Sequence, residues 1–180
     1  QYAAVISHPA GVLVTDIPAQ ETVQKSPWVK GRYQIRPLAT FSLDALVIRR
    51  QRYHDRGAEI APYDLVLGWQ QMSDQSVLDQ LKISQVWRWW QWHAKTQPTV
   101  PRRTIESSAS NMHIIPANEE IQRKVAHLRR GDIVFLKGYL VSVQGPDGFR
   151  WRSSLNRHDT GDGACELFWV EEIQIRTGEN

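Results

Sequence analysis

The stretch DIVFLKGYLVSV, residues 132–143, decides the fold class. It is an apolar run of strand length, and a single glycine, Gly138, interrupts it. A glycine inside an apolar strand is a common place for a small barrel to bend. We therefore expect a long strand here that curves as part of a barrel.

The segments around this stretch extend the β pattern. GPDG at 145–148 predicts a turn, and the alternation of apolar and polar side chains over 149–156 predicts a strand with one buried face. CELFWVEEIQI at 165–175 and NMHIIPA at 111–117 predict two more strands. The C-terminal third is thus expected to consist mainly of strands.

Two short helices are expected beside the strands. Asn118 is placed to cap a helix with one apolar face, and Gly131 suits the C′ position after it. Ser73 and Asp74 offer an N-cap to a second short helix.

The N-terminal half carries further strand patterns. Residues 12–14, 41–53 and 63–69 each predict a strand. Residues 83–93, ISQVWRWWQWH, hold half of the eight tryptophans and predict a strand with indole rings on both faces. A loop is expected after this aromatic segment.

Length and pattern together predict the architecture. A chain of 180 residues is about the size of one domain. We expect a mainly β (α+β) fold in which residues 1–180 form a single domain. In this domain N-terminal β elements (1–100) pack on a C-terminal part (105–176), which forms a small, OB-like barrel with the two short helices.

Charge and composition exclude few functions. The net charge of +3 permits an anionic partner without requiring one. Residues 121–157 are rich in Lys and Arg, residues 158–180 are rich in acids, and we expect these blocks to neutralise each other. One cysteine excludes an intrachain disulfide, and no apolar run is long enough to cross a bilayer. Because the chain begins at Gln1, we expect that an N-terminal segment was removed.

The stretch SSLNRHDTGDGACELFWVEE, residues 153–172, holds the candidate catalytic groups. Asp159 begins an Asp-Thr-Gly triplet like that of aspartic proteases, but the triplet occurs once and its flanking residues differ from theirs. We expect an ordered, non-catalytic loop in which Asp159 accepts hydrogen bonds from nearby backbone N–H groups.

Cys165 is the second catalytic candidate, with His113 or His158 as its base. It shares its strand face with apolar residues, so packing in the core is the favoured interpretation. Asp159, Asp162 and Glu166 fit a calcium site weakly, and the histidines are not at zinc-ligand spacing. We expect no metal and no cofactor.

The aromatic segment is the main binding candidate. Trp87, Trp90 and Trp92 with Arg88 could stack on bases or sugar rings, as in single-strand binders of the OB class. The alternative, that the indoles fill a core or line an interface, is favoured.

Several blocks of the chain resemble a family of small uncharacterised bacterial proteins that often begin with an export or anchor segment. The distinctive blocks are APYDLVLGWQQMSD, NMHIIPA, RRGDIVFLKGYLV and SSLNRHDTGDGACELFWVEEI, and the resemblance spans nearly the whole chain. It implies one integral domain on the periplasmic side of the bacterial cell envelope, with membrane attachment through the removed segment. It implies no activity.

The sequence therefore predicts a non-enzymatic binding module for a protein or glycan partner. The expected binding residues lie in the aromatic segment, in loop 153–166 and at one histidine: Trp87, Arg88, Trp90, Trp92, His113, Ser154, Arg157, Asp159 and Glu166. The alternatives are a hydrolase that uses His113, Asp159 or Cys165, and a weak binder of single-stranded nucleic acid. Nucleic acid is the less favoured partner.

Overall fold

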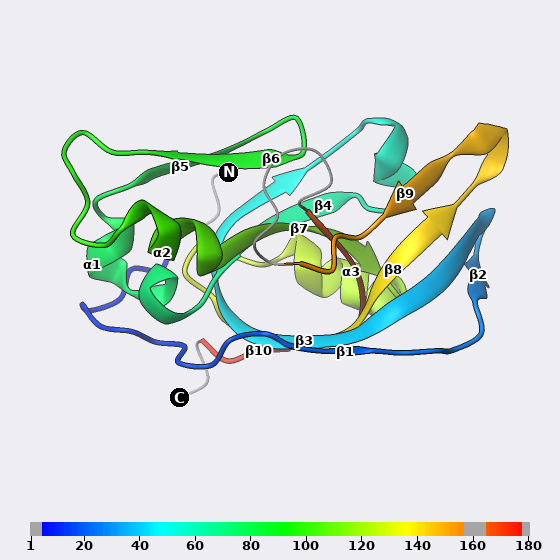
Figure 1. Cartoon of the computed structure of the whole chain (residues 1–180), viewed down its shortest axis with the longest axis horizontal. Coiled ribbons are helices and arrows are strands. Elements are labelled where there is room, and N and C mark those ends of the chain that lie inside the picture. The colour runs from blue at the N-terminus through cyan, green and yellow to red at the C-terminus, as the bar shows by residue number, and fades with distance from the viewer. Residues whose placement is uncertain (1–4, 157–164, 178–180) are drawn as a thin grey trace.

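The computed structural model describes residues 5–156 and 165–177. In these ranges the protein is mostly β, with three short α-helices among the strands (Figure 1). The strands are β1 (Ala19–Thr22), β2 (Trp28–Lys30), β3 (Tyr33–Arg52), β4 (Tyr63–Gly68), β5 (Lys82–Val86), β6 (Trp89–His93), β7 (Ala109–Pro116), β8 (Ile133–Gln144), β9 (Arg150–Arg152) and β10 (Glu166–Ile175). The helices are α1 (Gln75–Leu78), α2 (Arg102–Ser107) and α3 (Glu119–Ala126).

Five strands close into a ring in the order β3-β4-β7-β10-β8, with β8 pairing back onto β3. The β7–β10 pair is parallel, and the other four pairs are antiparallel. The long strand β3 makes closure possible, because its first part pairs with β8 and its last part with β4. The ring is part of a larger sheet to which β1, β2 and β9 add edges.

The inward-facing side chains of the ring form the main core. Alternate residues of the strands, such as Leu65, Met112, Leu136 and Phe168, are fully buried in one apolar cluster. Helix α3 connects β7 to β8 and adds its apolar face, including Val125, to this cluster. Alternation on the strands and helical spacing on α3 thus produce one continuous interior.

Two smaller apolar clusters lie outside the ring. One packs the β5–β6 hairpin and residues of α1 and α2 against Val66 of β4. The other lies between Trp169 of β10 and the extension formed by the start of β3, the end of β8, and β9. In Figure 1 the hairpin crosses the upper left of the ring, and the extension projects to the right.

The backbones of β8 and β10, which pair side by side, come closest at the expected glycine, Gly138. A Cβ atom on Gly138 would lie 1.8 Å from the backbone oxygen of Trp169. Next to this close approach, β10 has a bulge between Val170 and Glu172. Gly138 therefore allows a close approach of two backbones where the sheet curves.

The sequence located most of the regular elements. Strands were correctly predicted where β3, β4, β7, β8 and β10 lie, although β3 begins earlier than expected. Asp74 and Asn118 cap α1 and α3 by accepting hydrogen bonds from backbone N–H groups, as predicted.

Other expectations need correction. Residues 83–93 form a two-stranded hairpin and not one strand, and only 150–152 of the expected strand 149–156 is regular. Residues 12–14 form no strand. The loop expected over residues 95–103 ends earlier, because α2 begins at Arg102. Helix α3 ends at Ala126, so Gly131 lies in the turn beyond the helix C-terminus. The ring is not confined to the C-terminal half, because β3 and β4 supply two of its strands.

Candidate functional site

The outer face of β4 and β7 carries a row of buried polar side chains. Asp64 lies directly opposite His113 in the antiparallel pair, and Asn111 lies two residues before His113 on the same face. Their neighbours Leu65 and Met112 point into the ring core. Asp64, Asn111 and His113 are each at most 3% exposed, so they need partners within the protein.

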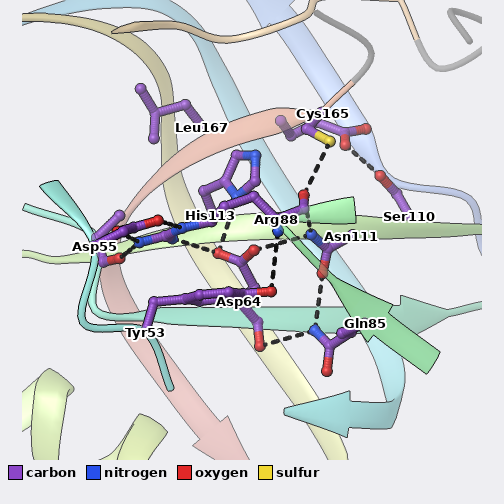
Figure 2. Close-up of polar contacts among 12 residues, drawn as sticks. Tyr53, Asp55, Asp64, Gln85, Arg88, Ser110, Asn111, His113, Cys165 and Leu167 are labelled. Carbon is purple, nitrogen blue, oxygen red and sulfur yellow. Dashed lines mark hydrogen bonds and ion pairs between the residues drawn. The ribbon is translucent and has the colours of Figure 1, made fainter. Parts of the chain in front are cut away.

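The β5–β6 hairpin supplies the central partner. Its two turn residues, Trp87 and Arg88, have φ angles of 56° and 68°. Positive φ at both positions is what a type I′ hairpin turn requires, and Asn and Gly normally occupy it. The turn directs the Arg88 side chain down onto the outer face of β4 and β7 (Figure 2).

Asp64 is the anion that receives Arg88. Its Oδ1 accepts a hydrogen bond from the Arg88 guanidinium at 2.8 Å and one from Nδ1 of His113 at 2.9 Å. Its Oδ2 accepts one from Asn111 at 3.0 Å. Because a carboxylate can only accept hydrogen bonds, Nδ1 of His113 is protonated and donates to Asp64. The buried carboxylate of Asp64 thus has the partly buried guanidinium of Arg88 as its counter-ion.

Arg88 is held by several further contacts. Asp55 accepts two hydrogen bonds from the guanidinium, at 2.9 and 2.8 Å, and the carbonyl of Ala61 accepts another at 2.9 Å. The ring of Tyr53 lies 4.1 Å from the guanidinium carbon. We call Tyr53, Asp55, Asp64, Arg88, Asn111 and His113 the Arg88 cluster.

The ion pair between Arg88 and Asp55 shifts the pKa values of both side chains. Burial lowers the pKa of Arg88, but hydrogen bonds and charge from Asp55 and Asp64 outweigh it, and the pKa is raised. The hydrogen bond from Arg88 lowers the pKa of Asp55. Both groups are therefore held in their charged forms.

Cys165 lies at the edge of the cluster, where its Sγ is 3.8 Å from the backbone oxygen of Arg88. The thiol is half-buried, and burial, with the charges of Glu166 and Asp64, raises its pKa to about 12. A thiol with this pKa remains protonated at neutral pH, whereas a nucleophilic cysteine needs the thiolate.

Glu166 and Ser154 lie near Cys165. Ser110 donates a hydrogen bond to the carboxylate of Glu166, which is buried. The backbone N–H of Ser154 donates to the carbonyl of Cys165, and its hydroxyl donates to the carbonyl of Asn156. These contacts link the end of β9 to the start of β10.

The tryptophans of the hairpin divide between its two faces. Trp90 and Trp92 pack against the apolar cluster beneath the hairpin. Trp87 is 84% exposed at the tip, flanked by the exposed side chains of Val86 and Trp89. Indole rings on both faces were predicted correctly, although for a single strand.

The structure brings Arg88 and His113 together through Asp64, but it does not bring all predicted site residues into one place. Trp87 is exposed at the hairpin tip, and Trp90 and Trp92 are packing residues. Arg157 and Asp159, together with His158 and Asp162, lie outside the described residues. Among the residues that are described, no group of three His, Cys, Asp or Glu side chains could hold a metal ion.

Sequence reasoning missed Asp64, Asn111, Tyr53 and Asp55. A signal for Asp64 was present, because an acid inside the apolar strand YDLVLGW must find a buried partner. Polar residues at 111 and 113 share one strand face, which also indicates a polar partner there.

Comparison with known proteins found no matching family model, no matching curated protein and no matching solved structure. Evidence about function therefore comes from the chain's own residues. Across the described ranges, no helix is both long and apolar enough to span a membrane.

Proposed function

We propose that this protein is a non-catalytic binding module with an OB-type barrel, which captures a protein partner through the tip of the β5–β6 hairpin. The closed five-strand ring supports the OB assignment. In OB barrels the face of the second and third strands binds oligonucleotides or oligosaccharides. The corresponding strands here are β4 and β7, and the Arg88 cluster of the protein itself occupies their outer face.

The observation that carries the proposal is the exposure of Trp87 on a fixed support. An indole that is 84% exposed is costly in water, and tryptophan is enriched among the residues that dominate binding energy. Arg88, the next residue, is anchored by ion pairs to Asp55 and to the buried Asp64. The tip is therefore ordered before binding, which lowers the entropic cost of association.

The surroundings of Trp87 favour a protein pocket over a glycan. Its exposed neighbours at the tip, Val86 and Trp89, are apolar. The nearby polar side chains Gln85 and Arg88 point inward, where Gln85 donates to Asn111 and Arg88 to Asp64. A sugar ring stacked on an indole needs polar partners for its hydroxyl groups, whereas an apolar pocket does not.

The Arg88 cluster supports a binding role more than hydrolysis. Both carboxylate oxygens of Asp64 already accept hydrogen bonds, and Nδ1 of His113 is engaged by Asp64. The raised pKa of Cys165 opposes its use as a nucleophile. The resemblance of the sequence blocks supports a location on the periplasmic side of the bacterial cell envelope.

Site-specific photocrosslinking in bacterial cells tests this proposal. A photoreactive amino acid at position 87 should give an adduct with one protein of discrete mass, whereas the same group at Val29, which is 71% exposed elsewhere, should not. Trp87→Asn should weaken binding of that purified partner at least about 30-fold, the effect of removing a hot-spot side chain. Asn tolerates the positive φ of this position, so the fold should be retained.

Equal adducts at positions 87 and 29, or an unchanged affinity of the Trp87→Asn variant, would contradict the proposal. If the wild-type protein binds neutral oligosaccharides and the Trp87→Asn variant does not, the partner of the hairpin tip is a glycan and not a protein.

A further inference from the structure

A second surface, remote in sequence from the hairpin, is formed by the extension of the sheet beyond the ring. The start of β3 pairs with β2 on one side and with the end of β8 on the other, and β8 pairs with β9. Directly opposed residues on antiparallel strands share a face. One row on this face is Val29, Gln34, Gln144 and Arg150, and the next contains Arg36, Ser142 and Arg152.

Burial separates the two sides of this extension. Ile35 and Val143 point the other way and are buried in the apolar cluster against β10. In the two rows, Ser142 is half-buried and the other six side chains are exposed. We call these seven residues the arginine face; it holds three arginines and no acidic residue.

The three arginines of this face have no counter-ion among the residues that the structure describes. No ion pair or hydrogen bond there involves the side chain of Arg36, Arg150 or Arg152. The expected neutralisation by the acidic block after residue 158 is therefore not found in the described part. Other arginines are paired, for example Arg32 with Glu59 and Arg176 with Asp44.

The shape of the face suits an extended ligand. A groove of about 370 Å³ is lined by the three arginines, Ser142 and Gln144, with Trp151 at its side. Arg36 and Arg152 lie two strands apart, which is roughly 10 Å at the usual strand spacing. The sheet holds both positions fixed, so an extended anionic chain can contact both without reordering the protein backbone.

We propose that the arginine face binds an acidic polysaccharide that carries carboxylate groups. The guanidinium fork matches a carboxylate with two parallel hydrogen bonds. Gln34, Gln144 and Ser142 lie between the arginines and supply amide and hydroxyl groups for sugar hydroxyls. This site is independent of the hairpin tip.

The same face is poorly suited to single-stranded nucleic acid. Such binders combine positive charge with aromatic rings on which bases stack. None of the seven residues of the arginine face is aromatic. Trp151 borders the groove, but its ring packs against the apolar cluster on the other side of the extension. There its centroid lies 4.8 Å from that of His113, and the ring lies beside Gly57.

Isothermal titration of the full chain with decagalacturonate, a polymer of carboxylated sugars, tests the site. The wild-type protein should bind at low salt, with an affinity that falls as salt rises. The variant R36Q/R150Q/R152Q should lose about 30-fold or more in affinity, since three charge pairs are removed. The control variant R102Q/R103Q/R123Q removes the same charge from exposed positions elsewhere, and its affinity should change less than threefold.

Both triple variants should fold, because all six substituted side chains are exposed. Thermal unfolding of each variant checks this. A neutral dextran of similar length should not bind the wild-type protein. The proposal is overturned by an equal loss in the two triple variants, by absence of decagalacturonate binding, or by tighter binding of a fifteen-nucleotide oligothymidylate than of decagalacturonate. The last result would assign the face to nucleic acid.

Discussion

At the scale of single residues, Arg88 has a large expected consequence for stability. It is the counter-ion of Asp64, whose side chain is fully buried. Arg88→Met keeps the apolar stem but leaves the carboxylate unpaired, so the free energy of unfolding should fall by about 3–5 kcal/mol. Urea unfolding measures this loss.

Arg103→Met is the matched control. Because Arg103 is exposed, this substitution should change the free energy of unfolding by no more than about 0.5 kcal/mol. Adding Asp64→Asn to Arg88→Met should cost less than the sum of the single changes, by about 1 kcal/mol or more. Additive losses would show that the two side chains do not interact.

Cys165 should react slowly in the folded protein. Its pKa, raised to about 12 from an ordinary 9.0, leaves little thiolate at pH 8. The higher nucleophilicity of a weakly acidic thiol offsets part of this loss, so the net rate should fall on the order of 30-fold. Reaction with a thiol reagent, followed by absorbance in native buffer and in denaturing urea, gives the two rates. Equal rates would mean that the thiol is not protected.

Acid should weaken the attachment of the hairpin through Asp55. The hydrogen bond from Arg88 lowers the pKa of Asp55 in the folded state below its ordinary value of 3.8. The stabilisation is therefore complete above about pH 4 and is lost as the pH falls through the lower folded value. Because Asp55 is 46% exposed, solvent screening keeps this contribution below about 1 kcal/mol. Asp55→Asn should remove that part of the acid dependence, as measured by unfolding between pH 2 and pH 6.

At the scale of elements, the close approach of the paired strands β8 and β10 depends on the absence of a side chain at Gly138. Gly138→Ala would place a Cβ atom 1.8 Å from the Trp169 backbone oxygen, so the strands must separate. We expect a loss of at least about 3 kcal/mol, at the upper end of overpacking effects. Gly31→Ala, where the added atom meets nothing within 4 Å but φ is +58°, should cost only about 1 kcal/mol. Calorimetry of the two variants measures both losses of stability. A smaller loss for Gly138→Ala than for Gly31→Ala would show that β8 and β10 can separate at little cost.

The elements that the sequence predicted are those with local causes. Alternation and apolar runs identify β8 and β10, and Asn118 caps its helix through a hydrogen bond three residues away. The hairpin was missed because Trp87 and Arg88 replace the Asn-Gly type of turn signal. Their positive φ angles are stabilised by contacts of Arg88 with distant residues, Asp64 among them. The candidate site was only half predicted for the same reason. The sequence pointed to Arg88 and His113, but their shared partner Asp64 lies on a different strand, β4.

At the scale of the whole molecule, the closed ring makes the two halves of the chain interdependent. Strands β7, β8 and β10 lie in the C-terminal half, and β3 and β4 close the ring between them. A fragment of residues 105–177 would leave edges of β7 and β8 unpaired and one side of the core exposed. We expect it to be unfolded or aggregated by circular dichroism, and to regain strand signal when mixed with residues 1–104. A folded, monomeric fragment would show that the ring is not needed.

The parallel pair β7–β10 also dictates the order in which the chain can assemble. Strand β10 inserts between β7 and β8, so the ring cannot close until the segment after residue 166 has been synthesised. Before that moment a nascent chain carries two open strand edges that can pair with other chains. Pairings between distant segments are also slow to form. Newly made copies of this protein are thus expected to need a folding helper that shields strand edges until the last strand arrives.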